Sequence, residues 1–183
     1  DGKMITYHSG GDIYVHDVLK NVNKKIEIIY NSPKIDIGRK FIPSYKYLES
    51  CTLSNDKNHI SFISRGKCLI MGAWNGPVTQ LGTRHGVRYK HSKFLQNDKR
   101  ILIISDKSNM ENIEVFNISS NTSKTYKSKC GRIINVKKSP TRDEFTFINH
   151  KHELHLFKIK DGSMLKIDRS ENDFIQSNWS PCG

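Results

Sequence analysis

The chain has 183 residues, of which 36% are hydrophobic and 26% charged, a composition that fits a globular protein and excludes a disordered tail. No apolar run approaches the roughly 20 residues that a membrane-spanning helix needs, which excludes a protein built on such helices. The net charge of +12 would suit nucleic acid, a membrane surface or acidic peptides as partners, but the basic residues are spread over every turn, and we expect neither nucleic acid nor a membrane to bind.

The first 30 residues predict three short strands. Residues 3–7 and 12–16 form the first two, and Ser9-Gly10-Gly11 joins them, because glycine readily adopts the positive φ values of a tight hairpin. The sequence KIEIIY at 25–30 alternates between polar and apolar side chains and predicts the third strand.

Residues 31–47 break this pattern. The segment contains Pro33, Gly38 and Pro43 and shows no clean period. Proline removes a hydrogen-bond donor from a sheet and punctuates strands. We therefore expect a linker over residues 31–47 and a domain boundary between residues 1–30 and residues 48–183.

From residue 48 onward the predicted strands become regular, with four in each repeat. They are 48–53, 60–64, 68–73 and 77–81, then 89–94, 101–105, 113–117 and 123–126, then 133–137, 145–149, 154–158 and 164–167. Residues 174–179 predict the first strand of a further repeat. Each run is rich in Ile, Phe, Val and Tyr and is bounded by Gly, Asn or Asp, and no segment predicts a helix.

A polar turn precedes the second strand of each repeat, and its copies begin at residues 54, 96, 139 and 180. The spacing of these turns gives the period of the repeat. A spacing of about 40 to 45 residues with several short strands is typical of a β-propeller blade. We predict an all-β fold, a β-propeller fragment of four-stranded antiparallel blades that spans the end of one propeller and the first blades of a second. A few blades cannot close a ring, and both ends of the chain fall inside the turn pattern, so we expect a piece of a longer protein.

With the repeats laid out, the chain resembles the tricorn protease family. The resemblance lies in DGKMITYHSGGDIYVHD at 1–17, ISFISRGKCLIM at 60–71, GPVTQLGTRHGVRYKHSKF at 76–94 and IEVFNISSNTSK at 113–124. Members of this family are large self-compartmentalising serine peptidases with two β-propellers ahead of their catalytic domains. Residues 1–30 resemble the last blade region of the six-bladed first propeller, and residues 48–183 resemble the first three blades and the start of a fourth of the seven-bladed second propeller.

The resemblance implies a noncatalytic propeller segment that guides or gates oligopeptides toward a distant active site for proteolysis. It also implies catalytic and PDZ domains elsewhere in the parent chain, a homo-hexamer, a cytoplasmic location and no cofactor. None of the family's catalytic motifs occurs here, so no catalytic residue is assigned. The alternative is a free-standing WD40-like or TolB-like propeller that acts as a protein- or ligand-binding scaffold, and a nucleic-acid-binding propeller ranks third.

The candidate site residues are basic. Arg84, His85, Arg88 and Lys90 lie between an outer strand and the next inner strand, and Arg132 lies at the equivalent place one repeat later. In a propeller this connection approaches the axis, where cations could attract peptide carboxylates. A solvated basic loop with no binding role is the simpler alternative.

Other reactive side chains suggest no second site. His150, His152 and His155 are close in sequence, but no fourth ligand accompanies them, so we expect no metal. No spacing brings Cys51 together with a histidine as a nucleophilic pair. The four cysteines form no C-x-x-C pair and predict small buried thiols in a reduced compartment. We expect Trp74 and Trp179 to pack between blades.

Overall fold

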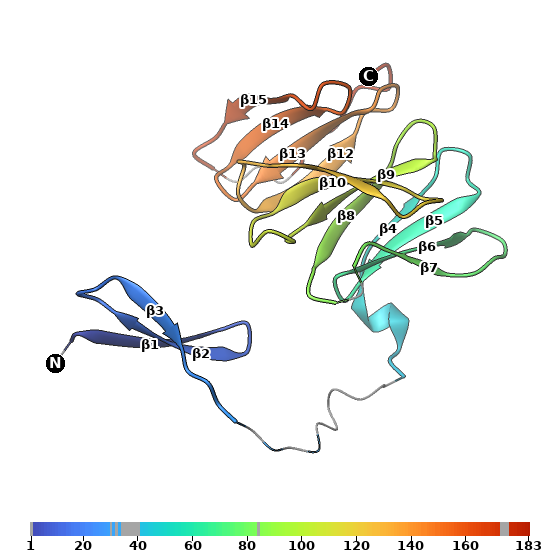
Figure 1. Ribbon diagram of the computed structural model, residues 1–183. Helices are drawn as coiled ribbons and strands as arrows, with labels where there is room; N and C mark the ends of the chain where they lie inside the picture. The colour runs from blue at the N-terminus through green and yellow to red at the C-terminus, as the bar shows by residue number, and fades with distance from the viewer. Residues whose placement is uncertain (1, 30, 32, 34–40, 84, 173–175) are drawn as a thin grey trace. The chain divides into compact units, whose positions relative to one another are not determined.

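The computed structural model describes residues 2–29, 31, 33, 41–83, 85–172 and 176–183, and its regular structure is almost entirely β (Figure 1). The chain divides into two compact units, residues 1–42 and 43–183. Among the described residues no helix is long and apolar enough to cross a membrane. Each unit is described separately below.

The first unit is a three-stranded antiparallel meander. It consists of β1 (Met4–Ser9), β2 (Asp12–Asp17) and β3 (Val22–Lys25), in that order. Gly10 and Gly11, both with positive φ, form the turn between β1 and β2 as predicted.

The third strand lies earlier than the sequence predicts. The prediction was 25–30, whereas β3 ends at Lys25 and residues 26–29 belong to no strand. The carboxylate of Asp17 accepts hydrogen bonds from the backbone N–H groups of Leu19 and Lys20, each at 3.0 Å. This side-chain turn reverses the chain directly after β2, so the strand that pairs with β2 begins before the alternating run.

The second unit contains three four-stranded antiparallel sheets, each a meander in chain order, which we call blades 1, 2 and 3. Blade 1 contains β4 (Leu48–Leu53), β5 (His59–Ser64), β6 (Lys67–Gly72) and β7 (Thr79–Leu81). Blade 2 contains β8 (Tyr89–Phe94), β9 (Arg100–Ser105), β10 (Asn112–Asn117) and β11 (Ser123–Tyr126). Blade 3 contains β12 (Ile133–Lys138), β13 (Glu144–Asn149), β14 (Glu153–Lys158) and β15 (Met164–Arg169).

These blades confirm the predicted all-β propeller fold. A short 3-10 helix, η2 (Ser44–Tyr47), which the sequence did not predict, precedes blade 1. In the strand expected at 174–179, residues 174 and 175 lie outside the described part of the chain, and residues 176–179 form no strand.

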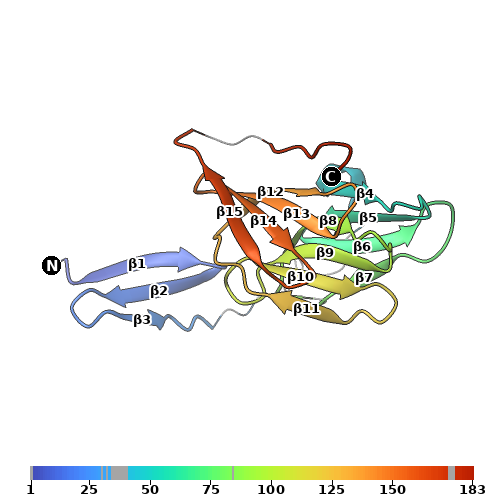
Figure 2. The same ribbon diagram turned by 90° about the horizontal axis from the view of Figure 1, so that it is seen from above.

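The blades are held together by apolar side chains that alternate along the buried strand β9. Ile101 and Ile103 belong to the core shared with blade 1, beside Ile63. Leu102 and Ile104 belong to the core shared with blade 3. Because successive residues of a strand point to opposite faces of the sheet, one strand supplies both interfaces. Blades 2 and 3 therefore lie side by side (Figure 2).

Hydroxyl groups on the first two strands of each blade form hydrogen bonds to the neighbouring part of the chain. The Thr52 hydroxyl donates to the carbonyl of Ser92, at 2.9 Å, across the contact between β4 and β8. The Ser61 hydroxyl donates to that of Ser92 at 2.5 Å, and Thr146 and Ser177 form a similar pair at 3.0 Å. Ser177 therefore meets blade 3 through the same kind of hydroxyl pair that joins β8 to blade 1.

The recurring turns also join neighbouring blades. The Asp98 carboxylate, in the turn of blade 2, accepts the backbone N–H groups of Asn55 and Asp56 in blade 1, both at 2.9 Å. In the same way Asp143 of blade 3 accepts the N–H of Gln96, at 2.7 Å. Charge-assisted bonds of this kind are among the stronger hydrogen bonds in proteins. The acidic residue of the turn motif thus links each blade to the one before it.

The cysteines and tryptophans only partly follow the prediction. Cys68 and Cys130 are buried, and burial raises the pKa of the Cys68 thiol to about 12. Cys51 and Cys182 are exposed, contrary to the expectation of four buried thiols. Trp74 is 90% exposed and packs between no blades of the described chain, because it lies at the tip of the turn after β6.

Candidate functional site

Three of the five candidate residues meet at one end of the blades. We call this end the start rim, because the inner strands β4, β8 and β12 begin there, and the opposite end the turn rim. Arg88, Lys90 and Arg132 line a depression of about 290 Å³ on the start rim, between blades 2 and 3. His85 is exposed and is not among the lining residues, and Arg84 lies outside the described residues.

Lys90 is held in place by its neighbours. Its Nζ lies 2.5 Å from Oε1 of Glu111, and the two side chains are only 16% and 17% exposed. Lys90 also donates to the carbonyl of Ile133, while Glu111 accepts the N–H of Ile133 at 2.7 Å. The pair therefore bridges blade 2 to the start of β12, and its charges largely cancel.

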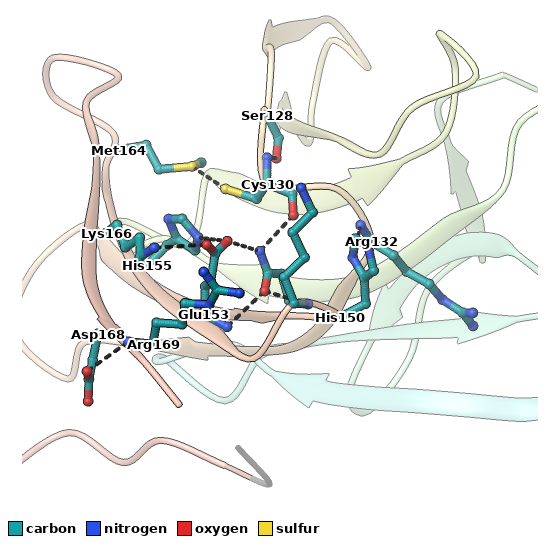
Figure 3. Close-up of polar contacts among 12 residues, drawn as sticks. Ser128, Cys130, Arg132, His150, Glu153, His155, Met164, Lys166, Asp168 and Arg169 are labelled. Atoms are coloured by element: carbon teal, nitrogen blue, oxygen red, sulfur yellow. Dashed lines mark hydrogen bonds and ion pairs between the residues drawn. The ribbon is translucent and has the colours of Figure 1, made fainter. Parts of the chain in front are cut away.

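Arg88 and Arg132 differ in how far their charge is neutralised. The guanidinium of Arg88 lies 3.3 Å from Oε2 of Glu49 on β4, and both side chains are partly exposed. The backbone N–H of Arg132 donates to Nδ1 of His150, at 3.0 Å. Its guanidinium extends away from Glu153 and His155 in Figure 3 and has no partner among the described residues. Of the three cations in this depression, Arg132 is the one without an ion pair among the described residues, and the carboxylate residue Asp106 lines the depression beside it.

Two further lysines lie on the inner strands, and the sequence reasoning missed them. The strand registers place Thr52, Lys93 and Lys137 at the same position of β4, β8 and β12. Burial, followed by the nearby charge of Lys137, lowers the pKa of Lys93. The side chain of Thr52 reaches the next inner strand, so this position lies where adjacent inner strands meet. All three equivalent residues are polar, but each inner strand carries other polar residues too, such as Glu49, His91 and Asn135, so polarity alone does not single out this position.

His91 occupies an irregularity in β8. The pairing register shifts between Lys90 and Lys93, and His91 has a positive φ of 51°. Burial, and then the charge of Lys90, lowers the pKa of His91. The imidazole of His91 is therefore neutral near pH 7. Together with Arg132 and His150, His91 lines a second depression on the same rim, with a volume of about 420 Å³.

His150 and His155 of blade 3 have different hydrogen-bond partners. His150 accepts a hydrogen bond from the backbone of Arg132, whereas His155 lies 3.4 Å from Oε2 of Glu153. Within the described residues no group of three or more His, Cys, Asp or Glu side chains is arranged to hold a metal ion.

Glu153 is instead the centre of a hydrogen-bonded network beneath the rim (Figure 3). Its carboxylate accepts from Nδ2 of the fully buried Asn149, at 2.8 Å, and from Nζ of Lys166, at 2.9 Å. Asn149 also donates to the carbonyl of Cys130, at 2.8 Å. The bond from Asn149, followed by that from Lys166, lowers the pKa of Glu153 to about 2. The network ties the strand ends of blade 3 to the segment that leads into β12.

Protonation of Glu153 should lower the stability of the chain in acid. A carboxylate whose folded pKa is lowered contributes stability above its ordinary pKa of 4.5, and the contribution is lost as the pH falls toward about 2. We expect the free energy of unfolding of the wild-type chain to fall more steeply over this range than that of Glu153→Gln. Urea denaturation at several pH values measures both slopes, and equal slopes would show that Glu153 is not the responsible group.

The comparisons with known proteins agree in fold and family. Residues 48–183 match the family described as the tricorn protease second beta propeller domain. A protein of Sulfurisphaera tokodaii named as a tricorn-like protease C-terminal subunit is 32% identical over 182 residues, which are 99% of this chain and 21% of that protein. The chain therefore spans about a fifth of the length of this relative.

Two solved structures show the same fold at lower identity. A crystal structure of the tricorn protease superposes with a TM-score of 0.65 at 19% identity, covering 94% of this chain and 16% of that one. TolB from Acinetobacter baumannii superposes with a TM-score of 0.59 at 14% identity, covering 94% of this chain and 42% of that one.

Proposed function

The chain belongs to the tricorn protease family, and from this premise we propose that it guides oligopeptides toward an active site that lies elsewhere in a parent serine peptidase. The segment itself is noncatalytic in this proposal. The remaining parts of the parent, with catalytic and PDZ domains, would carry out proteolysis, in a cytoplasmic homo-hexamer.

The observation that carries the proposal is the unpaired guanidinium of Arg132 at the start of the inner strands. Lys93 and Lys137, one on β8 and one on β12, add two cations without an ion pair among the described residues. Inner strands face the axis of a propeller, so these charges would lie along the route of a peptide. Cations on such a surface raise the rate at which anionic groups arrive, and they hold carboxylates by charge-assisted hydrogen bonds.

The ion pairs of the start rim have a different role in this proposal. Lys90 with Glu111 fixes the position of β12 against blade 2, and Arg88 with Glu49 joins β8 to β4. A rim built in this way holds the backbone of Arg132 in place, so that binding a carboxylate has to order only its side chain.

Photo-cross-linking in the full-length parent protein tests where peptides pass. Ile134 lines the depression beside Arg132, and Ile167 lies on the outer strand β15, yet both are isoleucines with 51% exposure. With photoreactive benzoylphenylalanine at either position, we expect an oligopeptide substrate to be captured at 134 and far less at 167. Equal capture at the two positions would contradict the proposed route.

A further inference from the structure

A second basic groove lies on the turn rim, between blades 2 and 3 and away from the inner strands. Its volume is about 770 Å³, within the range of ligand sites. It is lined by five cationic side chains, Arg100, Lys124, Arg142, Lys158 and Lys160. We propose that this turn-rim groove binds an acidic polypeptide segment of a partner protein.

The carboxylates of the groove are already engaged within the chain. Asp143 accepts the backbone N–H of Gln96 and lies 3.6 Å from Arg100. Glu144 lies 3.9 Å from Arg142 and 4.0 Å from Lys158. These acids each have partners within the chain, and with Asp161 they make three carboxylates against five cations, which leaves the groove with a net positive charge.

The third carboxylate of the groove, that of Asp161, is engaged locally. It accepts the backbone N–H of Ser163 at 2.9 Å and the hydroxyl of the same residue at 2.7 Å. The bond from the backbone of Ser163, followed by the bond from its hydroxyl, lowers the pKa of Asp161. The carboxylate therefore stays ionised while it stabilises the turn between β14 and β15. It is thereby committed to the turn, and the charge of Lys158 adds a smaller contribution to lowering its pKa.

Two lysines supply the unpaired charge. Lys124 and Lys160 are exposed and have no carboxylate partner among the described residues. Nζ of Lys124 lies 4.9 Å from the ring centre of Tyr126, a cation–π contact that orients the amine over the groove. Tyr126 is itself fixed, because its ring meets Phe157 edge-on at 5.2 Å and lies against Gly162. The groove thus combines a rigid aromatic floor with free cations.

The arrangement favours a polypeptide over a nucleic acid. Glu144 and Asp161 stand among the cations, and their fixed negative charges would repel a continuous line of phosphates. An extended peptide presents its carboxylates at intervals and can place them beside Lys124 and Lys160. Its backbone N–H groups can face the acidic side chains. A single aromatic ring also gives no row of stacking platforms for bases.

Equilibrium binding to the 183-residue chain tests this site. The probe is a fluorescein-labelled peptide of alternating Asp and Gly with blocked ends, measured by anisotropy in about 0.15 M salt, where charges beyond about 8 Å are screened. We expect Lys124→Glu with Lys160→Glu to weaken binding at least about tenfold. The control, Lys57→Glu with Lys127→Glu, makes the same change in net charge at exposed turns and should change affinity by less than about twofold.

Three outcomes would overturn the proposal. Equal weakening by both double variants would show binding to diffuse surface charge. Stronger binding of a single-stranded oligodeoxythymidine of equal charge, lost in the Lys124 and Lys160 variant, would make the groove a nucleic-acid site. Loss of peptide binding only in Arg88→Glu with Arg132→Glu would assign the peptide to the start rim, and would leave the proposed guiding function standing.

Discussion

Replacing Phe157 with alanine should lower the free energy of unfolding of the chain by about 3 to 5 kcal/mol. The side chain is 1% exposed and lies in the core shared by blades 2 and 3. Its ring is 5.2 Å from that of Tyr126 and 6.0 Å from that of Phe147. Removing it deletes contacts to both blades at once and leaves a cavity that hydrogen-bonded strands cannot close.

The matched control is Leu165→Ala, on the neighbouring strand β15. Leu165 pairs with Leu156 across the sheet but is 61% exposed, so its loss should cost less than about 0.5 kcal/mol. Urea denaturation followed by circular dichroism measures both values. If the two variants lost similar stability, the interface between blades 2 and 3 would not be the packed core described above.

The strands of blades 1 to 3 could be predicted closely because their signals are local. Turn residues and short apolar runs fix where each strand begins, and the structure moves those limits by one or two residues. The strand expected at 25–30 was misplaced, although residues 25–30 do alternate between polar and apolar side chains. The turn at Asp17 reverses the chain earlier, so residues 22–25 pair with β2 instead. Which run pairs with β2 depends on hydrogen bonds that hydrophobic alternation does not encode.

The start rim could be predicted in part. Arg88, Lys90 and Arg132 were grouped because they occupy related places in successive repeats, and the structure brings them to one depression. That Lys90 is neutralised could not be foreseen, because Glu111 belongs to a longer connection with no counterpart in blade 1. Lys93 was missed because β8 contains a bulge between Lys90 and Lys93. The alternation of side chains between the two faces of the sheet therefore does not continue unbroken along the strand.

Reversing the charges of Arg88 and Arg132 together in the full-length parent protein should lower kcat/KM for an acidic oligopeptide about tenfold at low ionic strength. Two glutamates on this rim would repel the carboxylates that we propose Arg132 attracts, and Glu49 would lose its partner. Because exposed charges are screened by salt, the loss should shrink as the ionic strength rises. A neutral peptide of the same length with blocked ends should be cleaved at an unchanged rate.

The most direct test of the guiding role is the ratio of kcat/KM for the acidic peptide to kcat/KM for the neutral one. We predict that Arg88→Glu with Arg132→Glu lowers this ratio about tenfold, while Lys57→Glu with Lys99→Glu, an equal change of net charge at two exposed residues of the turn rim, lowers it less than about twofold. A ratio that stays at the wild-type value in the first variant, or falls equally in both, would contradict the role assigned to the start rim.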